Sequence, residues 1–509
     1  MKHRLLILLS LLLSAACSGD LGNYVYTELE EPQIGGINAE YTVLAHSRLV
    51  IIPDFEPESF DDPERYSYSW KALGKGYTAA LQTLSEERNL NWAVELPAGS
   101  YTLYFRITDR SSGIFWQTQS ALEIRETTSK GWMALCRGAS DEADLQMYSE
   151  VTSKVYKGLL DNSGIPAAVG PRAIQWSYYA DSQSPFYLLC DNVSTRLSRE
   201  GFAWSEEYML RYEMGAGGEP LAECICDGAA CKLMIADGQA YYASCQLGVG
   251  LFASVKGTSD LAPFIGVNAC TKSIVVPVFL FYDTEGKRFM AYSPNLGSSD
   301  VGGYETLWEI NGLVDFLGSM PSGGEVTGSA FASFPQGMEL LTMQNSTYDP
   351  SGSNMGVTYS LLREGSRFEL YGVQLGELWG AVQIGDCAYA LGKAVYADLS
   401  ECSRISEASC YAFSPLRSAM YYSVGGDLYF VDLSAAAPGA ELQLSLSGEM
   451  ICDLEWHGYD LAVASLKGEN GTIRIYEGFD SDGDFSSVNP QKLEGFGEIA
   501  DICYRELEY

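Results

Sequence analysis

Histidine is nearly absent from this sequence. There are 3 histidines in 509 residues, and beyond the first seventeen positions only His46 and His457 occur. Catalytic zinc centres often use several histidine ligands, and Ser–His–Asp or Cys–His catalysis needs a histidine base beside the nucleophile. No Gly-x-Ser-x-Gly turn surrounds any serine. The sequence therefore argues against nucleophilic hydrolysis and against a multi-histidine zinc enzyme.

Basic residues are also scarce. The chain has 32 Lys and Arg against 66 Asp and Glu, which gives a formal net charge of −34. Nucleic-acid binding needs clustered bases to neutralise phosphates, and no basic patch occurs. Beyond the first seventeen residues no segment is apolar enough to span a membrane. Nucleic acid is therefore excluded as a partner, and membrane attachment would depend on the N-terminus.

The first seventeen residues have the order of a secretory signal. A basic head at residues 2–4 precedes the apolar run Leu5–Leu13, the small residues 14–16 and then Cys17. The run is too short to cross a bilayer, which takes about 20 residues. The cysteine after the small residues makes the segment resemble a bacterial lipoprotein signal. That resemblance implies that residues 1–16 are removed and that Cys17 is acylated, with residues 17–23 as a tether. More than one acyl chain would anchor the protein stably in the outer membrane, facing the cell exterior.

Residues 24–126 alternate apolar and polar side chains between turn signals. Six or seven short strands in about 100 residues predict an immunoglobulin-like β-sandwich, with Trp70 as its core anchor. Segments 22–31, 66–70 and 96–113 resemble the PKD-like lipoproteins of Bacteroidota, through an aromatic Tyr-x-Trp strand and a Thr108-Asp109 corner. The resemblance implies a spacer or adhesion module without chemistry of its own. It also implies an association with outer-membrane importers of the SusC/SusD type.

After the polar linker 125–130 the chain changes to repeated apolar hairpins. Seven hairpins over about 380 residues give units of roughly 50 residues, the size of a four-stranded blade. Turn dipeptides support the hairpins: Asp237-Gly238, Glu364-Gly365, Gly425-Gly426 and Asn470-Gly471. The sequence therefore predicts a β-propeller of about seven blades over residues 131–509, with further β-sandwiches as the alternative. The segment 447–456 recurs at 496–505, so we expect the C-terminal strand to complete the first blade.

Cysteines and one amphipathic segment yield further local predictions. Local disulfides are predicted for Cys224 or Cys226 with Cys231, and for Cys402 with Cys410, because the compartment is oxidising. Their connectivity cannot be deduced from sequence. Residues 306–319 carry apolar side chains at a 3.6 period, which predicts a helix inserted on one propeller face.

Two sets of residues are candidates for ligand binding. Aromatic side chains expected in loops would hold a glycan or a peptide on their faces. They are Trp176, Tyr178, Tyr179, Trp204, Tyr304, Trp308 and Trp379. The alternating acids Asp480, Asp482 and Asp484 could converge on Ca²⁺, although their spacing is not that of an EF-hand loop. No other cofactor is expected.

These observations favour a non-enzymatic, lipid-anchored surface protein that captures a substrate for, or docks on, a SusC/SusD-type importer. Tethering would raise the local ligand concentration without new contact energy. A propeller-type glycoside hydrolase or lyase is an alternative, since such enzymes use paired acids around the central channel. An adhesin or scaffold without a small ligand is a second alternative.

Overall fold

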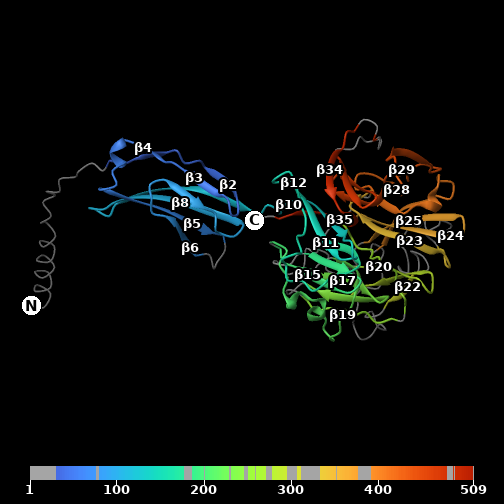
Figure 1. Ribbon diagram of the computed structural model, residues 1–509. Coiled ribbons are helices and arrows are strands. Elements are labelled where there is room, and N and C mark those ends of the chain that lie inside the picture. The colour runs from blue at the N-terminus through green and yellow to red at the C-terminus, as the bar shows by residue number, and fades with distance from the viewer. Residues whose placement is uncertain are drawn as a thin grey trace, which may run out of the picture. The chain divides into compact units, whose positions relative to one another are not determined.

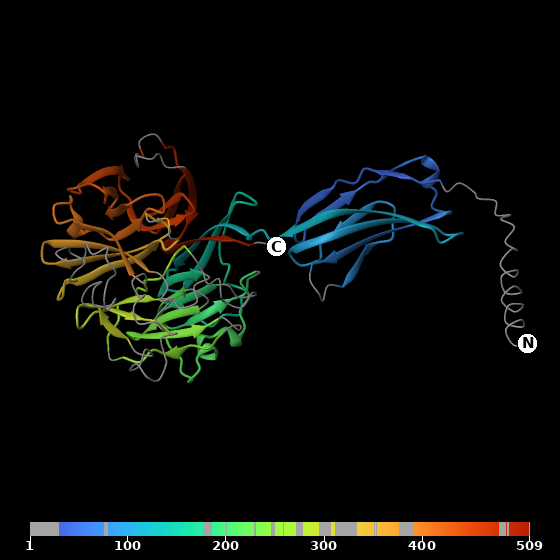
Figure 2. The ribbon, with the colours of Figure 1, turned by 180° about the vertical axis from the view of Figure 1, so that it is seen from behind.

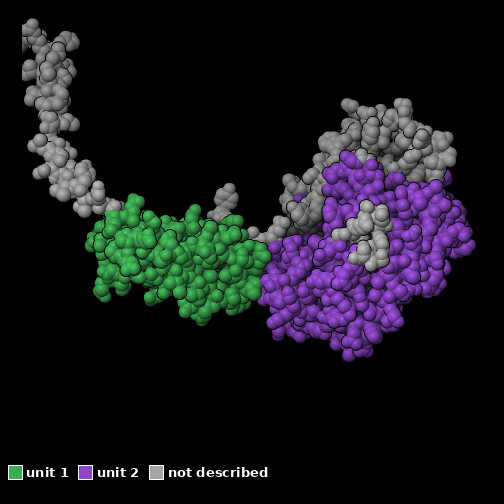
Figure 3. Space-filling view, turned by 90° about the horizontal axis from the view of Figure 1, so that it is seen from above, with its two compact units in different colours: residues 1–125, 509 green, residues 126–508 purple. Residues whose placement is uncertain are grey.

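The chain divides into two compact units, residues 1–125 and 126–508 (Figure 3). The computed structural model describes residues 30–75, 80–176, 186–199, 201–228, 231–245, 250–257, 259–270, 278–294, 307–310, 333–350, 352, 354–375, 391–477, 485 and 488–507. The side chains of 308 and 391–393 are not described. Cys17 and the tether lie outside these residues.

The first unit is a β-sandwich. Its five-stranded sheet has the order β2 (Glu40–Leu44), β9 (Phe115–Arg125), β8 (Gly99–Asp109), β5 (Tyr66–Gly74) and β6 (Leu81–Ser85). The remaining strands form two pairs: β1 (Gln33–Gly35) with β4 (Asp54–Glu56), and β3 (Arg48–Ile51) with β7 (Leu90–Ala93). A short 3₁₀ turn, η1 (Glu58–Phe60), follows β4. The alternating burial of β5 and β8 places every second side chain in one core.

Trp70 is at the centre of that core, as the sequence predicts. Its side chain is 0 % exposed on β5, and its ring centroid lies 4.5 Å from that of Phe105. The indole nitrogen donates to the Arg88 carbonyl at 3.2 Å, so its one polar atom is satisfied. At the predicted corner, Asp109 accepts the backbone N–H groups of Ser111 and Ser112. The Ser111 hydroxyl donates to the same carboxylate, and this bond together with the two backbone bonds holds the pKa of Asp109 well below its usual range.

The second unit is a β-propeller, and its described residues form seven sheets (Figures 1 and 2). Blade 1 is β35 (Glu498–Glu506), β10 (Lys130–Arg137), β11 (Ala143–Ser149) and β12 (Lys154–Tyr156). Blade 2 is β13 (Pro171–Trp176), β14 (Phe186–Cys190) and β15 (Ser194–Leu197). Blade 3 is β16 (Ala222–Gly228), β17 (Cys231–Ala236), β18 (Gln239–Ser244) and β19 (Ala253–Ser254). Blade 4 is β20 (Phe279–Asp283), β21 (Arg288–Tyr292) and β22 (Trp308–Ile310).

The last three blades are four-stranded. Blade 5 is β23 (Glu339–Ser346), β24 (Val357–Glu364), β25 (Arg367–Leu375) and β26 (Leu391–Asp398). Blade 6 is β27 (Cys410–Phe413), β28 (Ala419–Val424), β29 (Asp427–Asp432) and β30 (Ala440–Ser445). Blade 7 is β31 (Met450–His457), β32 (Asp460–Lys467), β33 (Asn470–Tyr476) and β34 (Gln491–Phe496). The described 3₁₀ turns of this unit are η2 (Glu206–Tyr208), η3 (Leu210–Glu213) and η5 (Ile405–Glu407).

The sheets are joined into a ring by their cores. Each of the seven apolar clusters found among the described residues of this unit combines side chains from two successive blades. One of them packs blade 7 against blade 1 through Ile473 and Trp132. Most of the strands named first in these blades lie next to one another: β13 contacts β16 and β35, β35 contacts β31, β31 contacts β27, and β27 contacts β23. These innermost strands therefore surround the propeller axis.

The C-terminal strand completes the first blade, which confirms the prediction from the repeat. β35 pairs antiparallel with β10 from Lys130↔Glu506 to Arg137↔Glu498. In Figure 1 the C-terminal strand accordingly lies beside the first strands of the same unit. The equivalent repeat segment contains β31, the innermost strand of the preceding blade. The two repeat copies thus occupy equivalent places in adjacent blades.

The predicted hairpins form, with small shifts in two turns. Asp237 and Gly238 both have positive φ, 49° and 67°, as a two-residue type I′ turn requires. The predicted turn at Asn470-Gly471 lies two residues earlier, because Gly468 takes the left-handed conformation (φ 63°) and β33 begins at Asn470. The predicted turn at Glu364-Gly365 lies one residue later, at residues 365–366 between β24 and β25, and Gly365 has a φ of 61°.

Two local predictions are wrong. Trp308–Ile310 is a strand that pairs with β21, so no helix covers those residues; the rest of 306–319, apart from 307, lies outside the described residues. The cysteines predicted to form disulfides are free: Cys224, Cys226, Cys231, Cys402 and Cys410. Cys402 and Cys410 direct their sulfurs to different backbone carbonyls, those of Pro438 and Ile451. These thiols therefore act as small apolar groups. In the described part of the chain, no helix is long and apolar enough to cross a membrane.

Candidate functional site

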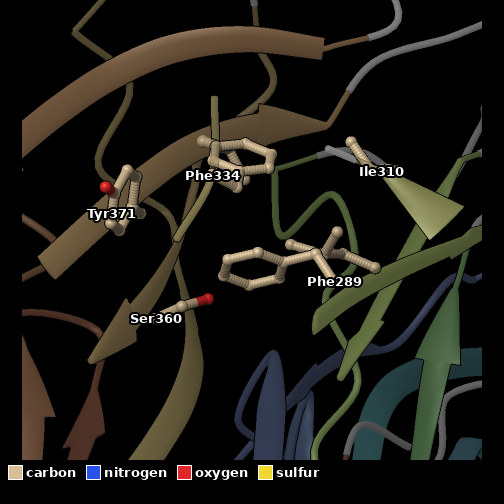
Figure 4. A pocket seen from close by; sticks show the side chains of 7 residues that line it. Phe289, Ile310, Phe334, Ser360 and Tyr371 are labelled. Carbon is tan, nitrogen blue, oxygen red and sulfur yellow. The ribbon is translucent and has the colours of Figure 1, made fainter. Parts of the chain in front are cut away.

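A small closed cavity lies between blades 4 and 5. Figure 4 shows the rings of Phe289, Phe334 and Tyr371 gathered around it with Ile310, and the Ser360 hydroxyl points toward it. Its volume is only about 10 Å³, which is near the minimum needed for one water molecule. This cavity is part of the core and has no room for a ligand.

An open hollow lies beside that core and shares Phe334 and Tyr371 with it. We call it the blade 4–5 hollow. Its volume is about 780 Å³, and its lining residues are Ser333, Phe334, Pro335, Gln336, Arg367, Glu369, Tyr371 and Tyr396. The rings of Tyr371 and Tyr396 are paired across β25 and β26, with centroids 5.2 Å apart. The Phe334 ring meets Tyr371 edge-on at 5.5 Å. The hollow thus combines aromatic faces with a few oriented polar groups.

Glu369 organises the polar side of the hollow. Its carboxylate is buried and accepts the hydroxyls of Tyr396 at 3.0 Å and Tyr371 at 3.2 Å. Arg367 donates to the same carboxylate and forms an ion pair with it. Burial and the Glu369 charge raise the pKa of Tyr396 to about 12, so the phenol keeps its proton. Since arginine and glutamate neutralise each other, the hollow favours an uncharged polar ligand with apolar faces.

The predicted ligand-binding aromatics are distributed differently. Trp176 stacks on Phe186 with centroids 5.9 Å apart, and Trp204 donates its indole N–H to the Thr195 hydroxyl at 2.9 Å. Both rings pack against the core between blades 1 and 2. Trp308 lies on β22, where the neighbouring Glu309 accepts a hydrogen bond from Gln336 of the hollow. The other candidates lie outside the described residues: Tyr178, Tyr179, Tyr304, Trp379, Asp480, Asp482 and Asp484. The ligand roles of all these residues stay predictions.

Sequence reasoning missed the hollow because its residues come from separated strands. Arg367, Glu369 and Tyr371 alternate along β25. This alternation of a base, an acid and an aromatic is the only signal in the sequence. The same alternation is typical of an ordinary strand face, and only the fold brings β26 and the segment before β23 beside it.

The innermost strands carry a second polar arrangement, which we call the axial belt. In this belt, side chains of one blade form hydrogen bonds with the backbone of a neighbouring blade. Asp453 accepts from Ile502 N–H at 3.0 Å, and Asp501 accepts from Ile174 N–H at 2.7 Å. Comparable bonds are made by Gln175, Gln344, Asn345 and Cys410. Of the seven junctions between blades, six have such a bond among the described residues. The belt therefore links neighbouring blades directly near the axis.

Asp453 and Asp501 form the least ordinary pair in the belt. The two carboxyl groups hydrogen-bond to each other where β35 closes the ring. Burial raises the pKa of Asp453, and burial together with the Asp453 charge raises the pKa of Asp501 well above its usual range. Two adjacent carboxyls cannot both ionise cheaply, so they share a proton.

This pair should make the propeller less stable as the pH rises. A carboxyl that keeps its proton in the folded chain after the unfolded chain has released it costs stability from about pH 4 upward. Each unit of pKa shift contributes about 1.4 kcal/mol. We expect Asp501→Asn to reduce the fall in unfolding free energy between pH 5 and pH 9, because the amide donates to Asp453 without a titrating proton. Urea unfolding at both pH values checks this.

The matched control is Asp237→Asn, at an exposed turn position that asparagine also tolerates. It should leave the pH dependence unchanged. An Asp501→Asn variant that loses as much stability on alkalinisation as the parent would contradict the shared-proton account.

The comparisons with known proteins concern both units. Residues 17–164 match the model of the PKD-like family. The match covers the sandwich and continues through β12 of blade 1, so it supports a PKD-like N-terminal domain without describing the whole chain. A search of curated proteins finds no match.

Solved structures that resemble the chain share little sequence with it. A quinonprotein alcohol dehydrogenase-like protein from Bacteroides thetaiotaomicron is 13 % identical, with 93 % of this chain and 99 % of that chain covered and a TM-score of 0.45. YCF48 from Cyanidioschyzon merolae is 12 % identical, covers 68 % of this chain and 95 % of its own, and has a TM-score of 0.36. Both scores are below 0.5, so the propeller assignment rests on the strand order and the ring of cores.

Among the described residues no group of three or more His, Cys, Asp or Glu side chains could hold a metal ion. The predicted Ca²⁺ ligands at 480–484 are not described.

Proposed function

We propose that this protein is a lipid-anchored accessory of a SusC/SusD-type importer, and that it captures a glycan or a peptide without catalysing a reaction. The blade 4–5 hollow is the observation that carries the capture step. Its paired tyrosines and its neutralised Arg367–Glu369 pair suit a ligand that is polar but uncharged. The lipoprotein-like N-terminus and the family match from residue 17 support the anchor.

Ligand capture is tested at Tyr396, whose ring is 38 % exposed. We expect Tyr396→Ala to weaken binding of a captured oligosaccharide or peptide about tenfold, because an aromatic face and a hydroxyl acceptor are lost together. Binding of a glycan and peptide panel by calorimetry provides the measurement. Tyr212→Ala is the control, since Tyr212 is 52 % exposed and lies on η3. Equal affinity of both variants for every ligand that binds would place capture elsewhere.

Membrane attachment is tested at Cys17. We expect Cys17→Ala to move most of the protein from the outer-membrane fraction to the soluble fraction, with its folding unchanged. The reason is that the acyl chains supply the membrane affinity, at about 0.8 kcal/mol for each buried CH₂. Fractionation and immunoblotting measure it. If the variant still sediments with the outer membrane, a protein partner holds it there.

The importer association is tested by affinity purification from membranes solubilised in mild detergent. Co-purification of an importer supports the proposal. Its absence, together with no glycan or peptide binding, would favour the adhesin or scaffold alternative. Turnover of any glycan by the purified protein would overturn the non-catalytic proposal.

A further inference from the structure

A pocket opens among three innermost strands of the propeller, apart from the blade 4–5 hollow. We call it the axial pocket. Its volume is about 470 Å³, within the range of small-molecule sites. β23 supplies Gln344, Asn345 and Ser346, the end of β27 supplies Phe413, and β31 supplies Glu455 and Trp456.

Glu455 is the one ionisable side chain that lines this pocket. Its side chain is exposed in the pocket. Among the described residues its carboxyl group has no ion-pair or hydrogen-bond partner. In contrast, the amides of Asn345 and Gln344 are already bonded, to the segment 265–267 and to the Tyr411 carbonyl. The pocket therefore presents one carboxyl group without a partner among the described residues, beside two amides that are already hydrogen-bonded.

The groups around Glu455 are acidic or neutral. Asp453 lies two residues earlier on β31, and Asp501 and Cys503 lie on the adjacent β35. Cys410 on β27 lies near Asp453, and the pocket residues of β23 do not titrate. No Lys or Arg lines the pocket. The local deficit of positive charge matches a cationic ligand.

We propose that the axial pocket binds a small polar molecule through a primary ammonium group, with Glu455 as its carboxylate partner. The rings of Phe413 and Trp456 form part of the wall of this pocket. This site goes beyond the proposed capture function, because the hollow lies on the outer strands of blade 5 and its charges are already balanced. A polyamine or the free N-terminus of a peptide would supply the same group.

Binding should be coupled to proton release. Burial and the neighbouring Asp453 raise the pKa of Glu455 to about 8, so near pH 7 the empty pocket holds a carboxylic acid. An arriving ammonium favours the carboxylate, and the displaced proton passes to solvent. Affinity then rises with pH below 8, by up to tenfold per pH unit for one released proton.

The experiment is calorimetry of the full chain with two pairs of probes. Putrescine is compared with 1,4-butanediol, and trialanine with N-acetylated trialanine. We expect the two ammonium probes, or one of them, to bind at least tenfold more tightly than their neutral twins. Titration in two buffers of different ionisation enthalpy should show about one proton released by the native protein. Discrimination within the putrescine pair would indicate a polyamine. Discrimination within the trialanine pair would indicate a peptide N-terminus.

Glu455→Gln should lower ammonium affinity at least tenfold and abolish the proton release. Glu441→Gln, an exposed position on β30, should change neither, and a melting curve reports the folding of both variants. Tyr396→Ala should leave ammonium binding intact, which separates this site from the blade 4–5 hollow. The proposal is overturned if no ammonium probe binds, if the neutral twins bind equally, or if Glu455→Gln binds as the native protein does.

Discussion

A chain that ends at Gly497 is expected to leave the propeller unfolded. The missing segment contains β35, which pairs with β10 over the whole length of that strand. It also removes Ile499 and Ile502 from the core between blades 7 and 1. Its loss exposes apolar surface, at about 25 cal/mol per Å², and leaves the N–H and C=O groups of β10 unpaired.

The same truncation removes Arg505, whose side chain is 0 % exposed. Arg505 donates from Nε to the Thr128 carbonyl at 2.8 Å and donates to the Arg199 carbonyl, so it joins the closing strand to the segment before blade 1 and to the segment after β15 of blade 2. A domain is stable by only about 5–15 kcal/mol, and these losses together exceed that margin. Circular dichroism and limited proteolysis of the truncated chain check the result.

Complementation distinguishes strand loss from a general defect. A synthetic peptide of residues 498–509, added to the truncated chain, should restore protease resistance of residues 126–497. Removal of residues 508–509 alone should have little effect, because β35 remains. A truncated propeller that melts cooperatively at the native temperature would show that the ring does not need its closing strand.

The propeller architecture could be predicted from the sequence because hairpin turns and a repeated segment are visible in the order of the residues. The return of the last strand to the first blade is confirmed. The repeated hairpins are confirmed too, for example that of β10 with β11. Trp70 was recognisable because an aromatic on a middle strand has few places other than the core. These features depend on neighbours in the chain or on one repeated pattern.

The features that were missed depend on residues far apart in the chain. The axial belt joins Asp453 to β35 and Asp501 to β13, across 49 and 327 positions. In sequence each is one acid among 66, and only the ring closure brings them together. The strand at Trp308–Ile310 was read as a helix for a related reason: its apolar residues fit a 3.6 period, but pairing with β21 decides the conformation.

Glu213→Gln is expected to destabilise the propeller by about 3–5 kcal/mol, because it leaves two buried cations without their carboxylate. Lys232 on β17 is 0 % exposed, and its ammonium forms an ion pair with Glu213. Arg196 on β15 approaches the same carboxylate at 2.8 Å. Tyr187 on β14 also donates to Glu213, at 2.8 Å, so the network joins blades 2 and 3.

The size of this effect comes from desolvation, not from the attraction of the pair. Two charges taken out of water are tolerated when a carboxylate and a phenol satisfy them, and removing the carboxylate exposes the full cost. Urea unfolding of Glu213→Gln measures it. The double variant Glu213→Gln with Lys232→Met should recover part of the loss, since only Arg196 then lacks its partner.

A surface pair provides the matched control for this network. Glu219 is paired with Arg211, but its side chain is 63 % exposed. Glu219→Gln should therefore change the unfolding free energy by less than about 1 kcal/mol. Equal effects of the two substitutions would mean that Glu213 is solvated in the native protein. In that case the junction between blades 2 and 3 would depend on its apolar cluster alone, in which Leu189 and Met234 are fully buried.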